Sequence, residues 1–136
     1  PPIGVDSAQG TAVRIQAGTW TRHPLTSGAT GIGGVSVSNG GFVIPLAGLY
    51  QVAVTVRMNA SPGSGYLAGA ALMVNGTVNN DSLFGYVPMN NGSWTSATAS
   101  GVVRLSAGDV VHVAGFHNLN GATNMQGFNV SVTYVA

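Results

Sequence analysis

The stretch GGFVIPLAGLYQVAV, residues Gly40–Val54, places Pro45 and Gly48 between two apolar runs. Proline has no backbone N–H to donate to a sheet, so the first run is expected to end as a strand at Pro45. Glycine permits a change of chain direction, and Gly48 precedes a new alternating run. The stretch therefore predicts a corner that joins two strands, with Phe42 and Ile44 pointing into a core.

Two further segments alternate polar and apolar residues with the period of two that is typical of a half-buried strand. In residues 49–59 the apolar face comprises Tyr50, Val52, Val54, Val56 and Met58. The opposite face comprises Gln51, Ala53, Thr55 and Arg57. At the end of the chain, Phe128, Val130, Val132 and Tyr134 alternate with Asn129, Ser131, Thr133 and Val135.

Short strands and turns are expected along the rest of the chain, and no window has a helical period of useful length. The other expected strands are Ala12–Gln16, Thr19–Arg22, Gly34–Ser38, Gly41–Pro45, Leu67–Asn75, Ser82–Val87, Thr95–Leu105 and Asp109–His117. The turns between them carry residues that tolerate positive φ: Ser38-Asn39-Gly40, Asn75-Gly76 and Asn91-Gly92. The Gly-rich segment Thr26–Gly34 is expected to be one long loop, and residues 1–11 an extended N-terminal arm. These features predict an all-β, antiparallel sandwich or barrel of about ten strands, with residues 1–136 in a single domain.

The composition is poor in charge. Only 5% of the 136 residues are charged, against about 25% in average proteins, and the chain has no Lys, Glu or Cys. A net charge of +1 gives no electrostatic basis for binding nucleic acid, and no run approaches the roughly 20 apolar residues of a membrane helix. We therefore expect no nucleic-acid partner and no membrane insertion. A nearly neutral surface suits dense packing against copies of the same chain.

The titratable residues do not form a recognisable catalytic or metal-binding pattern. A catalytic nucleophile requires a neighbouring base, and the chain lacks the G-x-S-x-G elbow. Asp109 follows Gly108 where a strand begins, and turn formation explains it better than catalysis does. His112 and His117 are five residues apart on one expected strand, so a regular strand points them to opposite faces. We expect no enzyme activity, no catalytic residues, no cofactor and no metal site.

Four motifs in order resemble the globular head of complement component 1q. Residues 41–50, GFVIPLAGLY, are similar to the family's F-x-x-P-x-x-G-x-Y, and residues 71–76, ALMVNG, to its strand that ends in Asn-Gly. Residues 103–111, VRLSAGDVV, resemble its L-x-x-G-D-x-V, and Gly127-Phe128 stands where its last strand has Gly-Phe. The resemblance covers roughly two-thirds of the chain, from Phe42 to the end. It implies a ten-stranded jelly roll of the complement-q and tumour-necrosis-factor type, assembled as a tight homotrimer.

In that family the inner sheet packs around a threefold axis. The resemblance therefore places eight residues in a trimer interface: Gln51, Ala53, Thr55, Arg57, Asn129, Ser131, Thr133 and Val135. One face of Thr95–Arg104 is expected to join them. These side chains are small and nearly uncharged, as a hydrogen-bonded interface could be, but a solvated sheet face would have the same pattern. Some family members hold calcium near the axis, and the shortage of carboxylates here argues against that ion.

The charge-poor composition favours the jelly rolls of bacteriophage virions over the family's secreted members. The leading hypothesis is a non-enzymatic structural protein on the virion surface, either a capsid decoration or a fibre tip, whose partners are itself and capsid or tail proteins. The alternative is a receptor- or glycan-binding module, in a tail-fibre tip used for host attachment or in a secreted protein. Such a module would recognise a host cell-surface glycan or protein through aromatic side chains near loops: Trp20, Tyr66, Tyr86 and Trp94. The competing interpretation of those aromatics is packing at the rim of the sandwich.

Overall fold

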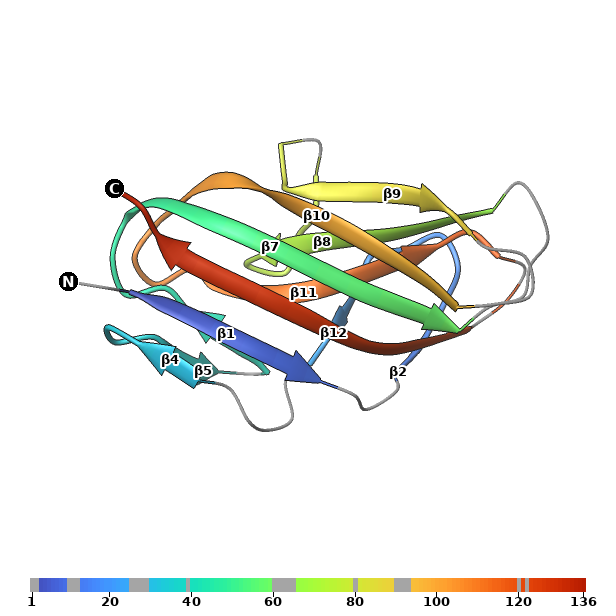
Figure 1. Ribbon diagram of the computed structural model, residues 1–136, viewed down its shortest axis with the longest axis horizontal. Helices are drawn as coiled ribbons and strands as arrows, with labels where there is room; N and C mark the ends of the chain where they lie inside the picture. The colour runs from blue at the N-terminus through green and yellow to red at the C-terminus, as the bar shows by residue number, and fades with distance from the viewer. Residues whose placement is uncertain are drawn as a thin grey trace.

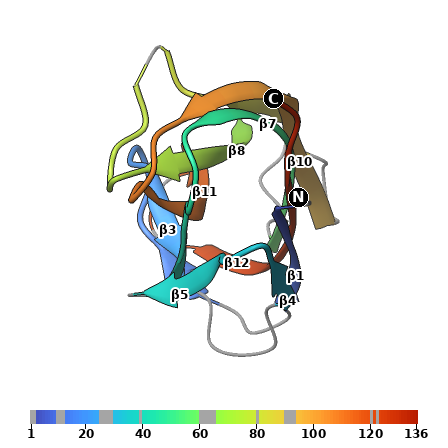
Figure 2. The ribbon, with the colours of Figure 1, turned by 90° about the vertical axis from the view of Figure 1, so that its left-hand side faces the viewer.

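Two antiparallel β-sheets lie face to face across an apolar interior, as Figures 1 and 2 show. The computed structural model describes residues 3–9, 13–24, 30–38, 40–59, 66–79, 81–89, 94–119, 121 and 123–136, with the backbone alone for residues 5–9, 30 and 59. Within these ranges the chain forms strands and turns and no helix. The expected all-β, antiparallel sandwich is confirmed.

The two sheets share the strands equally. Sheet A has the order β10–β7–β12–β1–β4, with β2 also paired to β12. Its strands are β1 (Gly4–Gln9), β2 (Val13–Ile15), β4 (Thr30–Ile32), β7 (Gly48–Asn59), β10 (Trp94–Leu105) and β12 (Thr123–Tyr134). Sheet B has the order β5–β6–β11–β8–β9, with β3 also paired to β11. Its strands are β3 (Thr21–His23), β5 (Ser36–Ser38), β6 (Gly41–Val43), β8 (Leu67–Val74), β9 (Phe84–Pro88) and β11 (Val110–His117).

Strand β7 alternates as its sequence predicts. Its inward side chains are at most 1% exposed: Tyr50, Val52, Val54, Val56 and Met58. The neighbouring strand β12 continues this apolar surface, because Val130 pairs with Val54 and Val132 with Val52. Sheet B closes the core from the other side with Leu72 of β8 and with valines of β11. Each fully buried side chain of this size contributes roughly 1.5–3 kcal/mol to the free energy of unfolding.

The corner between β6 and β7 carries the chain from sheet B to sheet A. Phe42 and Ile44 are 2% and 1% exposed, so both enter the core as predicted. Strand β6 ends before Pro45. The Tyr50 hydroxyl then donates a hydrogen bond of 2.6 Å to the Leu46 carbonyl oxygen, which ties the start of β7 to the corner.

Gly48 is needed at this corner for space and not for backbone freedom. Its φ is not among the positive values found in the described glycines. A Cβ at this position would lie 2.6 Å from Cε1 of Tyr134 and 2.7 Å from the carbonyl oxygen of Ala136. The end of the chain therefore packs directly over Gly48, and any larger residue must displace it.

Two segments that were expected to lie outside the sheets are strands. The N-terminal arm expected at residues 1–11 forms β1 over Gly4–Gln9, and the expected loop contains β4 over Thr30–Ile32. β1 pairs with β12 on one side and with β4 on the other. The backbone groups of β12 that face away from β7 need partners, and β1 supplies them. Residues 1, 2, 10 and 11 of the arm and residues 25–29 lie outside the described residues.

Strand β12 contains a β-bulge. Met125 pairs with Met58 and Gly127 pairs with Arg57, so Gln126 is one extra residue between two consecutive pairs. The strand begins at Thr123, five residues before the alternation that predicted it. The extra residue breaks the period of two, which hid this first part of the strand from the sequence pattern.

Polar side chains hold the turn between β10 and β11 against the end of β8. Asn75 and Gly76 have φ values of 51° and 82°, which confirms the predicted turn there. One carboxylate oxygen of Asp109 accepts a bond of 2.8 Å from the Ser106 N–H, and the other accepts one of 3.0 Å from the Asn75 amide. Asp109 thus has the predicted turn-forming role. The expected Asn91-Gly92 turn lies outside the described residues.

Candidate functional site

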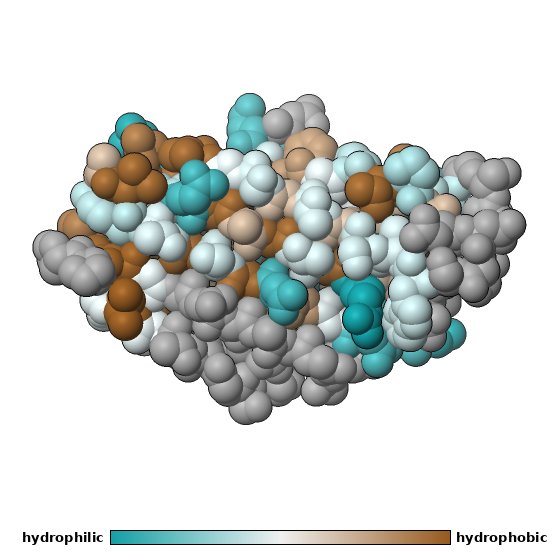
Figure 3. Space-filling view, viewed as in Figure 1, coloured by the Kyte–Doolittle hydropathy of each residue, from teal (hydrophilic) through white to brown (hydrophobic). Residues whose placement is uncertain are grey.

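Most of the side chains on the outer face of sheet A are short. Seven of the eight residues expected at the trimer interface lie on this face within β7 and β12, and the eighth, Val135, is exposed directly after β12. Alternate residues of β10 lie on the same face: Ser96, Thr98, Ser100, Val102 and Arg104. Figure 3 views this side of the molecule, and its centre is mostly white to pale teal. The face therefore lacks both a strong charge pattern and a continuous apolar patch in its middle.

These side chains stand in rows that cross three strands. Ala53 of β7 pairs with Ser100 of β10 and with Ser131 of β12. Residues paired across antiparallel strands point to the same side of the sheet, with Cβ atoms about 4.5–5.5 Å apart. The row through Ala53 is thus made of one methyl group and two hydroxymethyl groups. Another protein surface could approach the backbone of this sheet closely.

One end of the face is more apolar. Val102 pairs with Gln51, which pairs with Thr133 in the next strand. The side chains of Val102 and Val135 are 54% and 57% exposed. Exposed valines beside small hydroxyl groups resemble the mixed composition of protein–protein interfaces.

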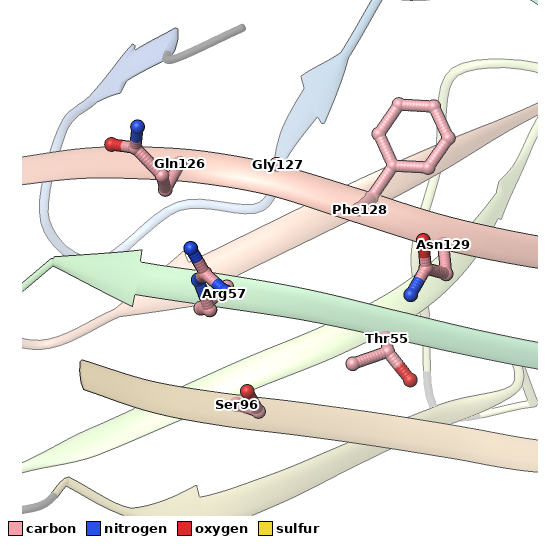
Figure 4. Close-up of a pocket in the computed structure, with 7 residues that line it drawn as sticks. All are labelled: Thr55, Arg57, Ser96, Gln126, Gly127, Phe128 and Asn129. Atoms are coloured by element: carbon pink, nitrogen blue, oxygen red, sulfur yellow. The ribbon is translucent and has the colours of Figure 1, made fainter. Parts of the chain in front are cut away.

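The other end of the face has a hollow of about 280 Å³ beside the β-bulge. Its lining residues are Thr55, Arg57, Ser96, Gln126, Gly127, Phe128 and Asn129. In Figure 4, Arg57 of β7 lies between Gln126 of β12 and Ser96 of β10, and Asn129 points toward Thr55. Hydroxyl and amide groups therefore surround a single guanidinium.

Arg57 is held by an aromatic ring and not by a carboxylate. Its Cζ atom lies over the Trp94 ring, 5.0 Å from the ring centroid. Within the described ranges, no Asp side chain forms an ion pair with this guanidinium. A planar guanidinium that stacks on an aromatic ring keeps its N–H edge available to an acceptor.

The outer face of sheet B carries a cluster of four aromatic rings, here called the aromatic cluster: Trp20, Phe84, Tyr86 and Phe116. The Trp20 ring is central, with centroids 6.1 Å from Phe84, 5.6 Å from Tyr86 and 5.4 Å from Phe116. Tilted and edge-to-face contacts at these separations are favourable. Ala71, Met73 and Ala114 form a small buried apolar layer against which Trp20 and Phe84 pack.

A glycine makes room for the cluster. Gly69 pairs with Phe116 on one side and with Tyr86 on the other. A Cβ at Gly69 would lie 2.8 Å from Cη2 of Trp20 and 3.0 Å from Cδ1 of Tyr86. The Trp20 ring therefore lies over the backbone of β8 at Gly69, between the Phe116 and Tyr86 rings. Tyr86 remains 45% exposed at the edge of the cluster.

The four aromatic residues expected at a recognition surface lie in different places. Trp20 and Tyr86 are in contact within the aromatic cluster. Trp94 lies on the opposite sheet, against Arg57, and Tyr66 packs against the main core. Phe84 and Phe116 were not among the residues predicted to form a recognition surface. Each alternates with inward-facing residues of its strand, and that alternation could have identified it as an outward-facing ring.

The two histidines of β11 point to opposite sides of sheet B. His117 is 0% exposed, and its Nε2 lies 3.0 Å from the Ile15 carbonyl oxygen. The N–H of Leu119 donates to Nδ1 of His117 at 3.2 Å, which leaves Nε2 as the ring nitrogen that faces the Ile15 carbonyl oxygen. His112 is 4% exposed and lies next to Gly41, at which a Cβ would be 2.7 Å from Nε2 of His112. In the described part of the chain, no three metal-ligating side chains come together.

No helix of the described residues is long and apolar enough to cross a membrane.

No family model matches the sequence, and no curated protein matches it. Solved structures do match its fold. The Eiger TNF structure from S. frugiperda has a TM-score of 0.68 at 14% identity, with 100% of this chain and 94% of that one covered. The vertex protein P5 of PRD1 has a TM-score of 0.63 at 18% identity, with 99% and 96% covered. Murine APRIL at pH 5.0 has a TM-score of 0.62 at 14% identity, with 96% and 98% covered. The chain therefore has the jelly-roll fold of the tumour-necrosis-factor type.

Proposed function

We propose that this chain is a non-enzymatic structural protein of a phage particle, a homotrimeric jelly roll on the virion surface that serves as a capsid decoration or a fibre tip. The observation that carries the proposal is the outer face of sheet A, where short and almost uncharged side chains cross β7, β10 and β12. The likeness to the PRD1 vertex protein, a phage protein, supports the setting. The resemblance to complement-q heads supports the trimer.

The outer face of sheet A leaves hydrogen-bonding groups and the sheet backbone uncovered. Hydroxyl groups such as those of Ser100 and Ser131 can form hydrogen bonds across an interface, and Ala53 between them permits close approach. Well-packed interfaces combine apolar contact with about one hydrogen bond per 100–200 Å². An exposed sheet face that serves only to contact water more often carries many long charged side chains, whereas the described side chains of this face include two, Arg57 and Arg104.

The mass of the protein in solution tests the proposal. A homotrimer has three times the subunit mass of 13.6 kDa, or about 41 kDa. Ala53→Arg places a charge in the middle of the face, where burial without a partner costs several kcal/mol, so the variant should have the mass of one subunit. Ala107 is exposed in the turn after β10, and Ala107→Arg is the matched control that should remain trimeric. A wild-type protein that is monomeric at micromolar concentration would contradict the trimer.

A second candidate function is recognition of a host cell-surface glycan or protein, in a fibre tip or in a secreted protein. The aromatic cluster favours it, because an aromatic surface with an exposed Tyr86 is a common platform for sugar rings and for protein contacts. The cluster lies on the sheet opposite the proposed interface, so both functions could operate in one trimer. Glycan arrays and cell-binding assays should show binding that Tyr86→Ala removes and Trp94→Ala retains. Binding that neither substitution affects would argue against this surface.

A further inference from the structure

The hollow beside the β-bulge has the shape of a small binding site. The extra residue Gln126 and the small residue Gly127 interrupt the row of side chains that otherwise covers the outer face of sheet A. Bulges commonly redirect side chains next to functional sites. The volume of about 280 Å³ is close to the lower limit for ligand pockets, which suits a group the size of an acidic side chain or a small organic acid.

The charge of the hollow is unbalanced. Arg57 is the one charged residue in its lining, and the Trp94 ring holds the guanidinium without neutralising it. Asp109 is engaged in its own turn, Asp81 is exposed in the connection between β8 and β9, and the side chain of the third aspartate, Asp6, is not among those described. Among the described side chains, therefore, no carboxylate of the same chain reaches Arg57.

The uncharged side chains that line the hollow can donate hydrogen bonds to a carboxylate. The Arg57 guanidinium can donate two parallel N–H bonds to a carboxylate, which is its preferred geometry. The side chains of Ser96, Thr55 and Asn129 lie around it and offer further donors. Phosphate is larger and would leave more of its oxygens without donors, because the lining contains a single cation.

We propose that this hollow is a carboxylate-binding site in which Arg57 holds the ligand bidentately. The carboxylate has two candidate sources, a small organic acid from solution or an acidic group of a neighbouring copy of the chain. The second source rests on the proposed trimer. If the outer face of sheet A is buried between subunits, Arg57 is buried as well, and an unpaired buried guanidinium is strongly unfavourable. A carboxylate in the hollow then completes the interface.

Acetate and acetamide provide a matched test, because they have nearly the same shape and differ in charge. Each is titrated into the wild-type protein at constant ionic strength, and binding is followed by calorimetry and by the melting temperature. Acetate should bind saturably and acetamide should not. Arg57→Gln should weaken acetate binding about tenfold or more, and Arg57→Lys should weaken it less because the charge remains. Arg22→Gln, at an exposed arginine of β3 in sheet B and outside the hollow, is the control and should bind acetate like the wild type.

The masses of the same variants distinguish the two sources. If acetate does not bind but Arg57→Gln weakens the trimer about tenfold while Arg22→Gln does not, a neighbouring subunit supplies the carboxylate. If acetate does not bind and both variants associate like the wild type, the proposed site is refuted while the trimer remains. If the wild type is a monomer that binds acetate through Arg57, the trimer is refuted while the site remains.

Discussion

The outer faces of sheets A and B differ in how far their own side chains cover the strands. On sheet B, Trp20 and its three neighbouring rings cover the strands with side chains of the same subunit. On sheet A, the row through Ala53 leaves the strands covered by a methyl group and two hydroxymethyl groups. The outer face of sheet B is therefore largely covered within one chain, whereas the outer face of sheet A is open to contact with a second molecule.

The two outer faces should also contribute to different properties, sheet B to the stability of one subunit and sheet A to the association of subunits. The aromatic cluster rests on a buried layer of Ala71, Met73 and Ala114, so it behaves as a second, smaller core. Among the described residues, the buried apolar clusters are the main core and this layer under the aromatic cluster, and neither lies on the outer face of sheet A. Substitutions on sheet B should therefore change the free energy of unfolding of one subunit, and substitutions on sheet A should change the association of subunits.

The largest expected effect on subunit stability is that of Trp20→Ala. Removing the central ring of the cluster should lower the free energy of unfolding by about 3 kcal/mol, because three ring contacts and the cover over Gly69 are lost. Trp94→Ala on sheet A should cost less than about 1 kcal/mol, the value of one exposed cation–π contact. Urea unfolding of both variants measures the difference, and equal costs would remove the contrast between the faces.

Gly48→Val should have an intermediate effect, of about 1–3 kcal/mol. The valine side chain would displace Tyr134 and the backbone of Ala136 at the start of β7, so the melting temperature and the yield of trimer should both fall. The aromatic cluster should keep its near-ultraviolet circular dichroism, because it belongs to the other sheet. An unchanged melting temperature would show that the end of the chain does not pack over Gly48. Gly48→Ala, with a single added carbon, should give a smaller effect of the same sign.

The smallest effect concerns pH. Burial raises the pKa of the Tyr50 hydroxyl above its usual value of 10.0, and the nearby Tyr134 raises it further. A group whose pKa is higher in the folded than in the unfolded state stabilises the fold below the unfolded value and loses this effect as the pH rises. The free energy of unfolding should therefore begin to fall above about pH 10. Tyr50→Phe should show a weaker fall in the same titration, and an identical one would assign the effect to other tyrosines.

The sequence predicted the features that depend on neighbouring residues. The alternation in residues 49–59 indicated which side chains of β7 are buried, and Pro45 indicated where the chain turns from one sheet to the other. The Asn75-Gly76 turn followed from the conformations that those two residues tolerate. Each of these predictions uses information within a few residues of the feature.

The features that the sequence did not reveal depend on distant pairing. Strand β1 has no clear alternation of its own, and its place in sheet A follows from β12 beside it. The aromatic cluster joins residues from three separate segments, Trp20 before β3, Phe84 and Tyr86 in β9, and Phe116 in β11, so no local sequence pattern predicts it. The bulge at Gln126 interrupts the period that would have extended the last strand, and the hollow around Arg57 exists because of that interruption.

The pairing of the first and last strands has a consequence for how the chain could be rearranged. The N–H of Tyr134 donates a bond of 2.9 Å to the carbonyl oxygen of Ile3, and in Figure 1 the start of β1 lies beside the end of β12. A short linker could therefore join them into a circle. New ends could then be opened at an exposed turn such as the one near Asn79, giving a circular permutant with every strand pair retained. In such a chain, the order in which the strands are synthesised would change while their neighbours in space stayed the same.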